Sequence, residues 1–291
     1  MRRRDFLVRT AALGAAMTPV GVLGEVGEAH DGERRRALRI GLTPVFLDDQ
    51  AAFLNRWRDY LSRASGYEVV FVQRSSYREI SEQIASNALD VAWMCGYPYV
   101  MDSERLRLLA VPLHLGRPAY RSYLITPEDA PVARIEELEG KVFAFSDPNS
   151  FSGSLYPRFL LHHAGHTPDS LFRRSFFTWS HRKVVEAVAV GLADGGAVAG
   201  YVWETLDRLH PEITRRTRVV SRSPSYGFPP FVARRDLPAA VFSRLQSVFF
   251  GMRDDDEGLR LLTALNLDGF VPGTPEQFSE IREMARLVDR R

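Results

Sequence analysis

Residues 143–154 read Phe-Ala-Phe-Ser-Asp-Pro-Asn-Ser-Phe-Ser-Gly-Ser, an apolar alternating run that breaks at Asp-Pro-Asn into a loop rich in hydroxyl groups. The run is typical of a strand, and the amphipathic segment 155–163 that follows is typical of a helix. Ser150, Ser152 and Ser154 therefore stand where a helix begins, where backbone N–H groups lack intrahelical partners and the macrodipole is positive. We expect this junction to hold a small anion.

A simple helix cap is the alternative interpretation, because Ser150 or Ser152 could cap the helix and serine does this well. A cap needs one side-chain oxygen, whereas this loop carries three hydroxyl groups, with Gly153 among them. The additional hydroxyl groups favour an anion site over a cap alone.

The first residues have the pattern of an export signal. A basic start is followed by a moderately apolar stretch and by small residues near Ala29, and the arginine pair before Asp5-Phe6-Leu7 resembles a twin-arginine signal. The apolar stretch is shorter than the ~20 residues that span a bilayer. A disordered basic N-terminus is the alternative. We predict that residues 1–29 direct the protein to the periplasm.

Strand-like and helix-like segments alternate through the rest of the chain. This order predicts an α/β protein with mostly parallel sheets flanked by helices. About 260 residues suit two lobes better than one core. The predicted strands are 38–42, 68–72, 90–94, 142–145, 176–177 and 196–200, and the predicted helices are 51–64, 77–86, 153–164, 181–192, 237–251 and 257–265.

Extended segments at 120–126 and 218–232 are predicted to carry the chain from one lobe to the other and back. Ligands of open α/β sheets bind beyond the carboxyl ends of the strands, and each lobe offers two loops at such ends. A ligand between the lobes would meet all four loops, which is the geometry of hinged closure. The predicted parts are a first lobe of 33–124 with 225–291, an inserted second lobe of 125–224, hinges near 123–126 and 222–228, and ligand loops at 43–49, 95–99, 147–154 and 178–182.

Composition excludes several classes of function. The 38 basic and 36 acidic residues leave a net charge of +2, so no nucleic-acid partner is predicted. Cys95 is the only cysteine, which rules out an internal disulfide. The sequence has no Gly-x-Ser-x-Gly motif, and the cluster His162, His163 and His166 lacks further metal ligands nearby. We therefore predict no enzymatic activity, no cofactor and no metal.

Several stretches resemble the periplasmic phosphonate- and phosphite-binding proteins of ABC transporters. Their order and spacing match from about residue 38 to residue 270, and the motif Asp-Pro-Asn-Ser-x-Ser-Gly at 147–153 is the most specific. The other stretches are Asp-Val-Ala-Trp at 90–93, Tyr-Arg-Ser-Tyr at 120–123, Ser-His at 180–181, Val-Gly-Leu-Ala-Asp at 190–194, Ser-Pro at 223–224 and Arg-Arg-Asp-Leu at 234–237.

The resemblance implies a two-lobed periplasmic-binding-protein fold of type II that closes on a small phosphorus oxyanion. In that family a serine loop grips the anion oxygens, helped by a histidine at the start of a later helix and by an aromatic hydroxyl of the first lobe. Position by position, the serines and the histidine correspond to Ser150, Ser152 and His181.

This sequence departs from the family pattern at three places. Phe151 stands where the family has a hydroxyl between the two serines, and the first-lobe tyrosine falls on Met94 or Cys95. The carboxylates with which members read an aminoalkyl tail fall on Tyr201 and Pro229. A compact anion such as phosphite, phosphate or methylphosphonate is therefore favoured over an aminoalkylphosphonate.

Other side chains are candidates for the same site. His181 follows the N-cap residue Ser180 and is expected to contact the ligand, while Tyr123, near the hinge, and Tyr201 could wall the cleft. Glu204, one helical turn beyond Tyr201, could replace a missing carboxylate. For each tyrosine the alternative is ordinary packing.

Cys95 leaves two functions open. A free cysteine is usually a small buried apolar residue, and the protein is then a receptor that delivers an oxyanion to an ABC permease. Within the same family, periplasmic arsenite-binding sensor proteins use one cysteine and signal to a membrane histidine kinase. In that alternative Cys95 is a thiolate ligand and the partner is a sensor kinase.

Overall fold

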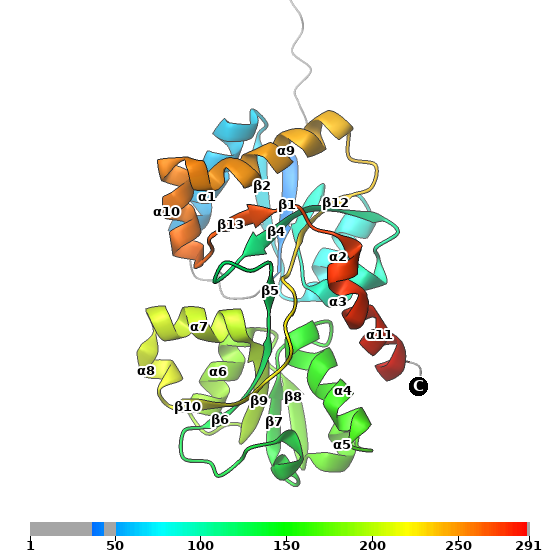
Figure 1. Ribbon diagram of the computed structural model, residues 1–291, viewed down its shortest axis with the longest axis vertical. Helices are drawn as coiled ribbons and strands as arrows, with labels where there is room; N and C mark the ends of the chain where they lie inside the picture. Colours follow the sequence, from blue (N-terminus) through cyan, green and yellow to red (C-terminus); the bar gives the residue numbers. More distant parts are fainter. Residues whose placement is uncertain (1–36, 44–50, 290–291) are drawn as a thin grey trace, which may run out of the picture. The chain divides into compact units, whose positions relative to one another are not determined.

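The computed structural model describes residues 37–43 and 51–289, which belong to one compact unit. Two β-sheets organise these residues, one of six strands and one of five (Figure 1). We call the six-stranded sheet with its helices the first lobe, and the five-stranded sheet with its helices the second lobe. The predicted signal at 1–29 lies outside the described residues, and no described helix is long and apolar enough to cross a membrane.

The sheet of the first lobe has the strand order β13-β4-β12-β3-β1-β2. Parallel pairing joins β1 to β2 and to β3, whereas β12 runs antiparallel to its neighbours β3 and β4, and β13 is antiparallel to β4. The strands are β1 (Leu38–Leu42), β2 (Val69–Gln73), β3 (Val91–Trp93), β4 (Leu106–Leu113), β12 (Phe231–Arg234) and β13 (Gly269–Val271). The helices are α1 (Ala51–Ser65), α2 (Tyr77–Ala85), α3 (Gly96–Met101), α9 (Ala239–Gly251), α10 (Asp256–Leu265) and α11 (Ser279–Val288), with 3-10 turns η3 (Met252–Asp254) and η4 (Pro275–Phe278).

The sheet of the second lobe has the order β10-β6-β9-β7-β8. Here β7 pairs in parallel with β8 and β9, and β6 is antiparallel to β9 and β10. The strands are β6 (Ser122–Pro127), β7 (Val142–Phe145), β8 (Arg174–Phe177), β9 (Gly195–Ala199) and β10 (Thr217–Arg222). The helical segments are η1 (Ile135–Leu138), η2 (Phe151–Leu155), α4 (Tyr156–His163), α5 (Pro168–Leu171), α6 (His181–Ala189), α7 (Gly200–Leu209) and α8 (Pro211–Thr214).

The expected α/β class with two lobes is confirmed, but the sheets are mixed rather than mostly parallel. The parallel pairs come from the strand–helix–strand units recognised in the sequence. The antiparallel strands β6, β10 and β12 belong to the segments that pass between the lobes, and such segments can run against the strands they join. This correction leaves the carboxyl ends of β1, β3, β7 and β9 as the edges where a ligand would bind.

The two crossing segments meet in a short antiparallel pair, β5 (Ala119–Tyr120) with β11 (Tyr226–Gly227). β6 begins directly afterwards, and Ser122 already pairs with Ala199 of the second sheet. The boundary predicted between residues 124 and 125 falls inside β6, because an extended crossing segment and the strand that continues it have the same sequence pattern.

Trp57 on α1 lies at the centre of the first-lobe core and is fully buried. Its ring meets Trp93 and Phe231 edge-on, each at 6.0 Å between ring centroids, and those two rings stack at 5.1 Å. Burial of such large apolar side chains supplies most of the free energy of folding. The cluster fixes β3 and β12 beside each other and thereby places the loop that follows β3.

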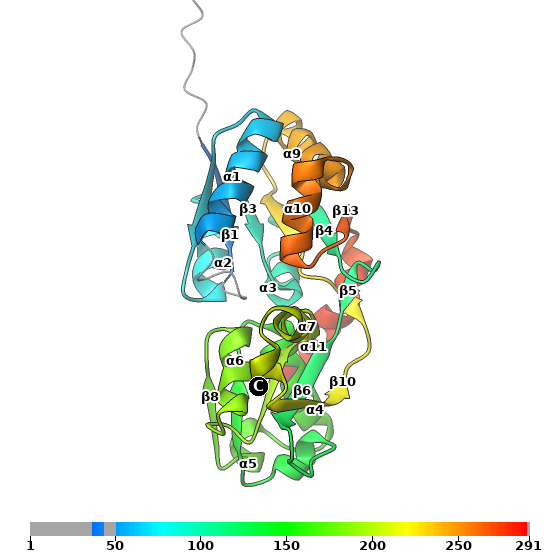
Figure 2. The same cartoon turned by 90° about the vertical axis from the view of Figure 1, so that its left-hand side faces the viewer.

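The C-terminal helix α11 packs against α3 of the first lobe and α4 of the second (Figures 1 and 2). Asp289, just beyond it, accepts hydrogen bonds from the Tyr97 hydroxyl and from Arg158 at 3.2 Å. This helix is not among those predicted from the sequence, although Ile281, Met284 and Ala285 have the spacing of a helix face and are buried. The helix therefore spans both lobes on one side of the molecule.

Candidate functional site

A small cavity lies between the two lobes where the strand ends meet. The centre of a water-sized sphere can occupy about 20 Å³ of this cavity. By this measure ~10–15 Å³ already holds one water molecule, so the cavity has room for a compact group of atoms. Both lobes contribute to its wall. The first lobe supplies Thr43, Tyr77, Trp93, Cys95, Tyr120, Phe228 and Pro229, and the second lobe supplies Ser152, His181, Ala199 and Tyr201.

The serine loop opens with a wide helical turn. η2 has π-type hydrogen bonding, with the N–H of Leu155 bonded to the carbonyl of Ser150 at 2.9 Å, and α4 continues it from Tyr156. The Ser150 hydroxyl caps this turn by accepting the N–H of Gly153 at 3.0 Å. Ser150 thus performs the capping function that was the alternative interpretation, while remaining beside His181.

Ser152 and Ser154 behave differently from Ser150. Their side chains are buried. Ser154 Oγ has no hydrogen-bond partner among the described residues, and Ser152 Oγ makes no hydrogen bond of normal length there, although its hydroxyl lies near that of Tyr120. Leaving a buried hydroxyl unpaired costs about 1–3 kcal/mol. Ser152 lines the cavity, so an oxygen of an anion bound beside its hydroxyl would give that hydroxyl a partner.

Gly153 is required by close packing. A Cβ atom at this position would lie 1.9 Å from Ser146 Oγ and 2.9 Å from His181 Cε1. Ser146 is also buried, and its hydroxyl has no partner in the described part of the chain. The glycine therefore lets the serine loop lie directly against the histidine. The sequence analysis did not single out Ser146, although it belongs to the same loop.

His181 begins α6 and is a neutral donor. Its Nδ1 accepts the backbone N–H of Ala199 at 3.1 Å, which assigns the ring proton to Nε2. Burial lowers the pKa of His181 to about 3, so the ring is uncharged near neutral pH. Nε2 lies 3.3 Å from Ser150 Oγ. Because Nε2 already carries the proton, His181 cannot take one from Ser150, and the pair is not a nucleophile with its base.

Cys95 is the N-cap residue of α3 and faces the second lobe. Its Sγ accepts the backbone N–H of Phe151 at 3.2 Å and lies 3.8 Å from the Tyr120 hydroxyl. Burial raises the pKa of the Cys95 thiol and of the Tyr120 hydroxyl, so both keep their protons. Tyr120 is a first-lobe aromatic hydroxyl at the cavity that the sequence analysis did not select.

The two tyrosines predicted for the site, Tyr123 and Tyr201, lie differently with respect to the cavity. Tyr201 lines the cavity with its ring, and its hydroxyl donates to the carbonyl of Leu265. Tyr123 is not among the residues that line this cavity, because side chains alternate along β6. Ser122 faces the serine loop and donates to the carbonyl of Ser152 at 2.6 Å, whereas Tyr123 points to the opposite face and donates to Glu204.

Neutral hydrogen-bond donors characterise the cavity. No Lys, Arg, Asp or Glu side chain is found among the described residues that line it. Asp147 lies close by, buried, and accepts the N–H groups of Tyr77 and Asn149 at 3.0 and 2.7 Å. Glu204 lies outside the cavity wall and is bonded to His114 and Tyr123. The site thus offers donors to a compact anion and, in the described residues, no carboxylate for an ammonium group.

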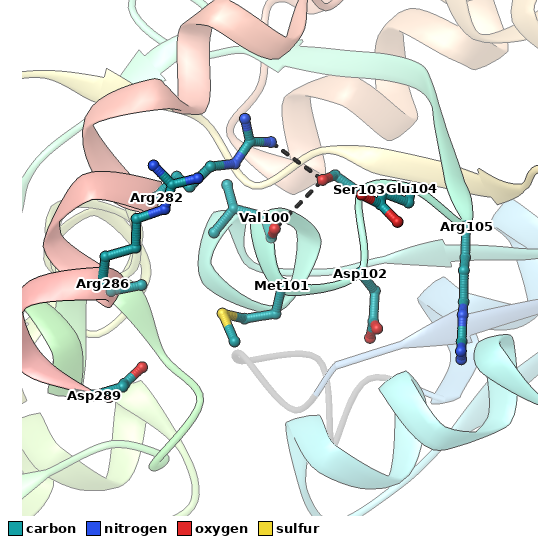
Figure 3. A pocket seen from close by; sticks show the side chains of 10 residues that line it. Val100, Met101, Asp102, Ser103, Glu104, Arg105, Arg282, Arg286 and Asp289 are labelled. Atoms are coloured by element: carbon teal, nitrogen blue, oxygen red, sulfur yellow. Dashed lines mark hydrogen bonds between the residues drawn. The ribbon is translucent and has the colours of Figure 1, made fainter. Parts of the chain in front are cut away.

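A larger hollow of about 750 Å³ lies at the surface, between the end of α3 and α11 (Figure 3). Arg282 and Arg286 face it from α11, and Asp102 and Glu104 face it from the first lobe. The two signs of charge compensate each other, and Arg282 donates to Ser103 at 3.1 Å. This open hollow is not at the carboxyl ends of parallel strands, so we assign the candidate ligand site to the smaller cavity.

Residues 40–278 match the family described as the periplasmic substrate-binding protein of phosphonate ABC transporters. The chain belongs to this family. Membership confirms the resemblance carried by the serine loop. Members of this phosphonate-binding family are periplasmic substrate-binding proteins and not enzymes, which agrees with the prediction of no catalytic activity.

Individual relatives are similar over most of their length. The phosphonates-binding periplasmic protein of Escherichia coli (strain K12) is 26% identical over 270 residues, covering 88% of this chain and 78% of the relative. The probable ABC transporter phosphite-binding protein PhnD1 of Prochlorococcus marinus (strain MIT 9301) is 25% identical over 271 residues, covering 88% and 91%. The solved structure of that PhnD1 with methylphosphonate superimposes with a TM-score of 0.79 at 22% identity, covering 89% of this chain and 100% of that one, which supports the type II fold.

Proposed function

We propose that the protein captures a compact phosphorus oxyanion between its lobes and delivers it to an ABC permease. The observation that carries this proposal is that Ser152 lines the inter-lobe cavity while its buried hydroxyl makes no hydrogen bond of normal length among the described residues. The neutral N–H of His181 and the start of η2 lie on the same side of the cavity. Hydroxyls, an imidazole N–H and a helix start together favour negative charge.

The ligand class follows from size and charge. The cavity is small, and no carboxylate lines it among the described residues, so it favours phosphite, methylphosphonate or phosphate over an aminoalkylphosphonate. The relatives support this class, since one is a phosphonates-binding protein and another was solved with methylphosphonate.

Calorimetry of the mature protein with phosphite, methylphosphonate, phosphate and 2-aminoethylphosphonate tests the proposal. We expect binding of at least one of the three compact anions and weaker binding of the aminoalkyl compound. A ligand present at 100 times its dissociation constant should also add about 2.7 kcal/mol to the free energy of unfolding. Tight binding of 2-aminoethylphosphonate alone would contradict the proposed ligand class.

A sensor of the arsenite-binding type is the second candidate, because Cys95 lines the cavity. The raised pKa of this thiol and its hydrogen bond with the N–H of Phe151 favour a structural role instead. Arsenite binding that is lost in Cys95→Ser, with no binding of a phosphorus anion, would establish the sensor function and overturn the transport function.

Export by the twin-arginine pathway is part of the same proposal. It rests on the sequence pattern of residues 1–29, together with the periplasmic location of the family. Replacing Arg3 and Arg4 by lysine should leave the precursor in the cytoplasm, because the pathway reads the arginine pair. Unchanged export of that variant would contradict the pathway while leaving the ligand site untouched.

A further inference from the structure

We propose that protonated His114 is a latch that holds the two lobes closed, so that capture of an anion is coupled to uptake of a proton. The latch rests on the proposed function in one respect: an anion is the ligand whose binding drives closure of the lobes. It deepens that function by naming two residues outside the ligand cavity that set ligand affinity.

His114 bridges the lobes. It follows β4 in the first lobe, its exposed fraction is 5%, and its Nε2 lies 2.8 Å from Oε2 of Glu204 on α7 of the second lobe. Its Nδ1 lies 2.8 Å from the carbonyl oxygen of Asn266, which follows α10 in the first lobe. α7 lies on the side of the second lobe that faces the first (Figures 1 and 2).

The two partners of the ring dictate its charge. A carboxylate and a carbonyl oxygen both accept hydrogen bonds, so both ring nitrogens must donate. Only the imidazolium form carries a proton on each nitrogen. Burial opposes this charged form, but the hydrogen bonds to Glu204 and Asn266 outweigh it and raise the pKa of His114.

Glu204 is held in place for this contact. Its second oxygen accepts the Tyr123 hydroxyl. Burial opposes ionisation, but the hydrogen bonds from His114 and Tyr123 lower the pKa of Glu204. The carboxylate is therefore ionised and oriented, and the pair is half-buried, with exposed side-chain fractions of 5% for His114 and 30% for Glu204.

Four further charged residues lie near the pair, two acting at its partners and two lining the same surface hollow. Asp268, in the segment between α10 and β13, adds to the negative potential at His114, and Arg222 of β10 adds positive potential at Glu204. Arg117 and Arg121 share a surface hollow with the pair and oppose the imidazolium charge. The two direct acceptors at 2.8 Å are the nearest groups to the ring and determine its protonation.

The latch lies directly behind the wall of the ligand cavity. The Tyr201 ring lines the cavity and packs edge-on against His114, with 5.0 Å between ring centroids. Phe228, a second wall residue, lies 6.3 Å from the same imidazole. Since Tyr201 and Glu204 share α7, separation of the lobes would part Glu204 from His114 and withdraw Tyr201 from the cavity.

The sign of the pH dependence follows from these contacts. In an open form His114 loses Glu204, and its pKa falls towards the ordinary value of about 6.5. The closed form has the higher pKa, so closure stabilised by the latch is fully present below about pH 6.5 and is lost as the pH rises through the raised closed-form pKa. Between these two values, closure on a ligand takes up a proton.

Calorimetry with methylphosphonate at several pH values from 6.5 to 8.5, each in two buffers of different ionisation enthalpy, measures this uptake. Glu204→Gln keeps the shape of the side chain and removes its charge, so it should bind fewer protons than the wild type and bind methylphosphonate at least about fivefold more weakly. The anion's own titration contributes equally to both proteins and cancels in the difference. Equal proton uptake in the two proteins overturns the latch.

A matched control lies in the same lobe. His210 and Glu212 form an exposed pair at 3.3 Å within one lobe, so Glu212→Gln should leave proton uptake and affinity unchanged. An equal effect of Glu212→Gln would mean that net charge, and not the latch, explains the result.

A failure of the proposed function is distinguishable from a failure of the latch. If no tested anion binds the wild type, the proposed function fails, and small-angle scattering of the ligand-free protein still tests the latch. The latch predicts a smaller radius of gyration at pH 6 than at pH 8 in the wild type and no such change in Glu204→Gln. A pH-independent radius in the wild type would then overturn the latch too.

Discussion

The thiol of Cys95 in the first lobe accepts the backbone N–H of Phe151 in the second lobe, at 3.2 Å. Phe151 stands where the resemblance places a hydroxyl, and Cys95 is, with Met94, one of the two residues on which the family's first-lobe tyrosine falls. These two positions are in contact. Neither side chain offers the hydroxyl that the resemblance implies, and the two residues instead join the lobes through this hydrogen bond.

Ser152→Ala should weaken ligand binding without lowering the stability of the folded protein. The hydroxyl makes no hydrogen bond of normal length in the described structure, so its loss should leave the melting temperature of the ligand-free protein unchanged or higher. Anion affinity should fall by roughly 1–3 kcal/mol, because one charge-assisted hydrogen bond is lost. Calorimetry and thermal unfolding measure the two quantities. Ser243→Ala, on an exposed face of α9, is the control, and unchanged anion affinity in Ser152→Ala would remove the loop from the site.

Gly153→Ala should damage both folding and binding. The added methyl group would collide with Ser146 and approach His181, and overpacking of this kind typically costs about 1–3 kcal/mol. Urea unfolding measures the loss. Gly251→Ala is the matched control, because a Cβ atom there meets no neighbour within 4 Å and the helical backbone tolerates alanine. Equal stability of the two variants would contradict the packing around Gly153.

The buried neutral His181 predicts a loss of stability in acid. Its folded-state pKa of about 3 lies below the unfolded value near 6.5, so the unfolded chain binds a proton first as the pH falls. Relative to His181→Asn, the wild type should lose about 2 kcal/mol between pH 7 and pH 5. Urea unfolding of both proteins at the two pH values measures this difference. A difference that does not change with pH would mean that His181 is charged or exposed in the native state.

Cys95 should react slowly while the protein is folded. Its thiol is buried and burial raises its pKa, and alkylation requires an accessible thiolate. Mass spectrometry after iodoacetamide treatment at pH 8 should show little modification of the native protein and full modification in urea. Rapid native alkylation would instead support an exposed thiolate and the arsenite-sensor function.

The local pattern of apolar and polar side chains was sufficient to predict the serine loop and most of the strands and helices. The alternation before Asp147 and the amphipathic segment after Ser154 predicted the junction of β7 with η2 and α4. α6 ends at Ala189, three residues before the predicted end at residue 192, and Gly191, at a φ of +74°, lies just beyond it. Such small differences at helix ends are expected, since the last turn depends on capping contacts.

Site residues of the first lobe were harder to predict. Tyr120 and Tyr123 belong to the same quoted stretch, and only the strand register shows that Tyr120 lines the cavity while Tyr123 faces away. Tyr77 appeared only as the start of a helix, although it lines the cavity and its N–H bonds to Asp147 of the second lobe. A shift of one residue in register moves a strand side chain to the other face.

The sequence by itself determined the alternating α/β order, the serine-rich helix start, the balance of charge and the lone cysteine, because these depend on neighbouring residues and on composition. Only the tertiary structure decided that Cys95 meets Phe151, that His181 donates from Nε2, and that His114 pairs with Glu204. These partners lie 56, 18 and 90 residues apart in the chain. Contacts at such separations depend on how the strands and the two lobes pack, and the local pattern of side chains does not encode that packing.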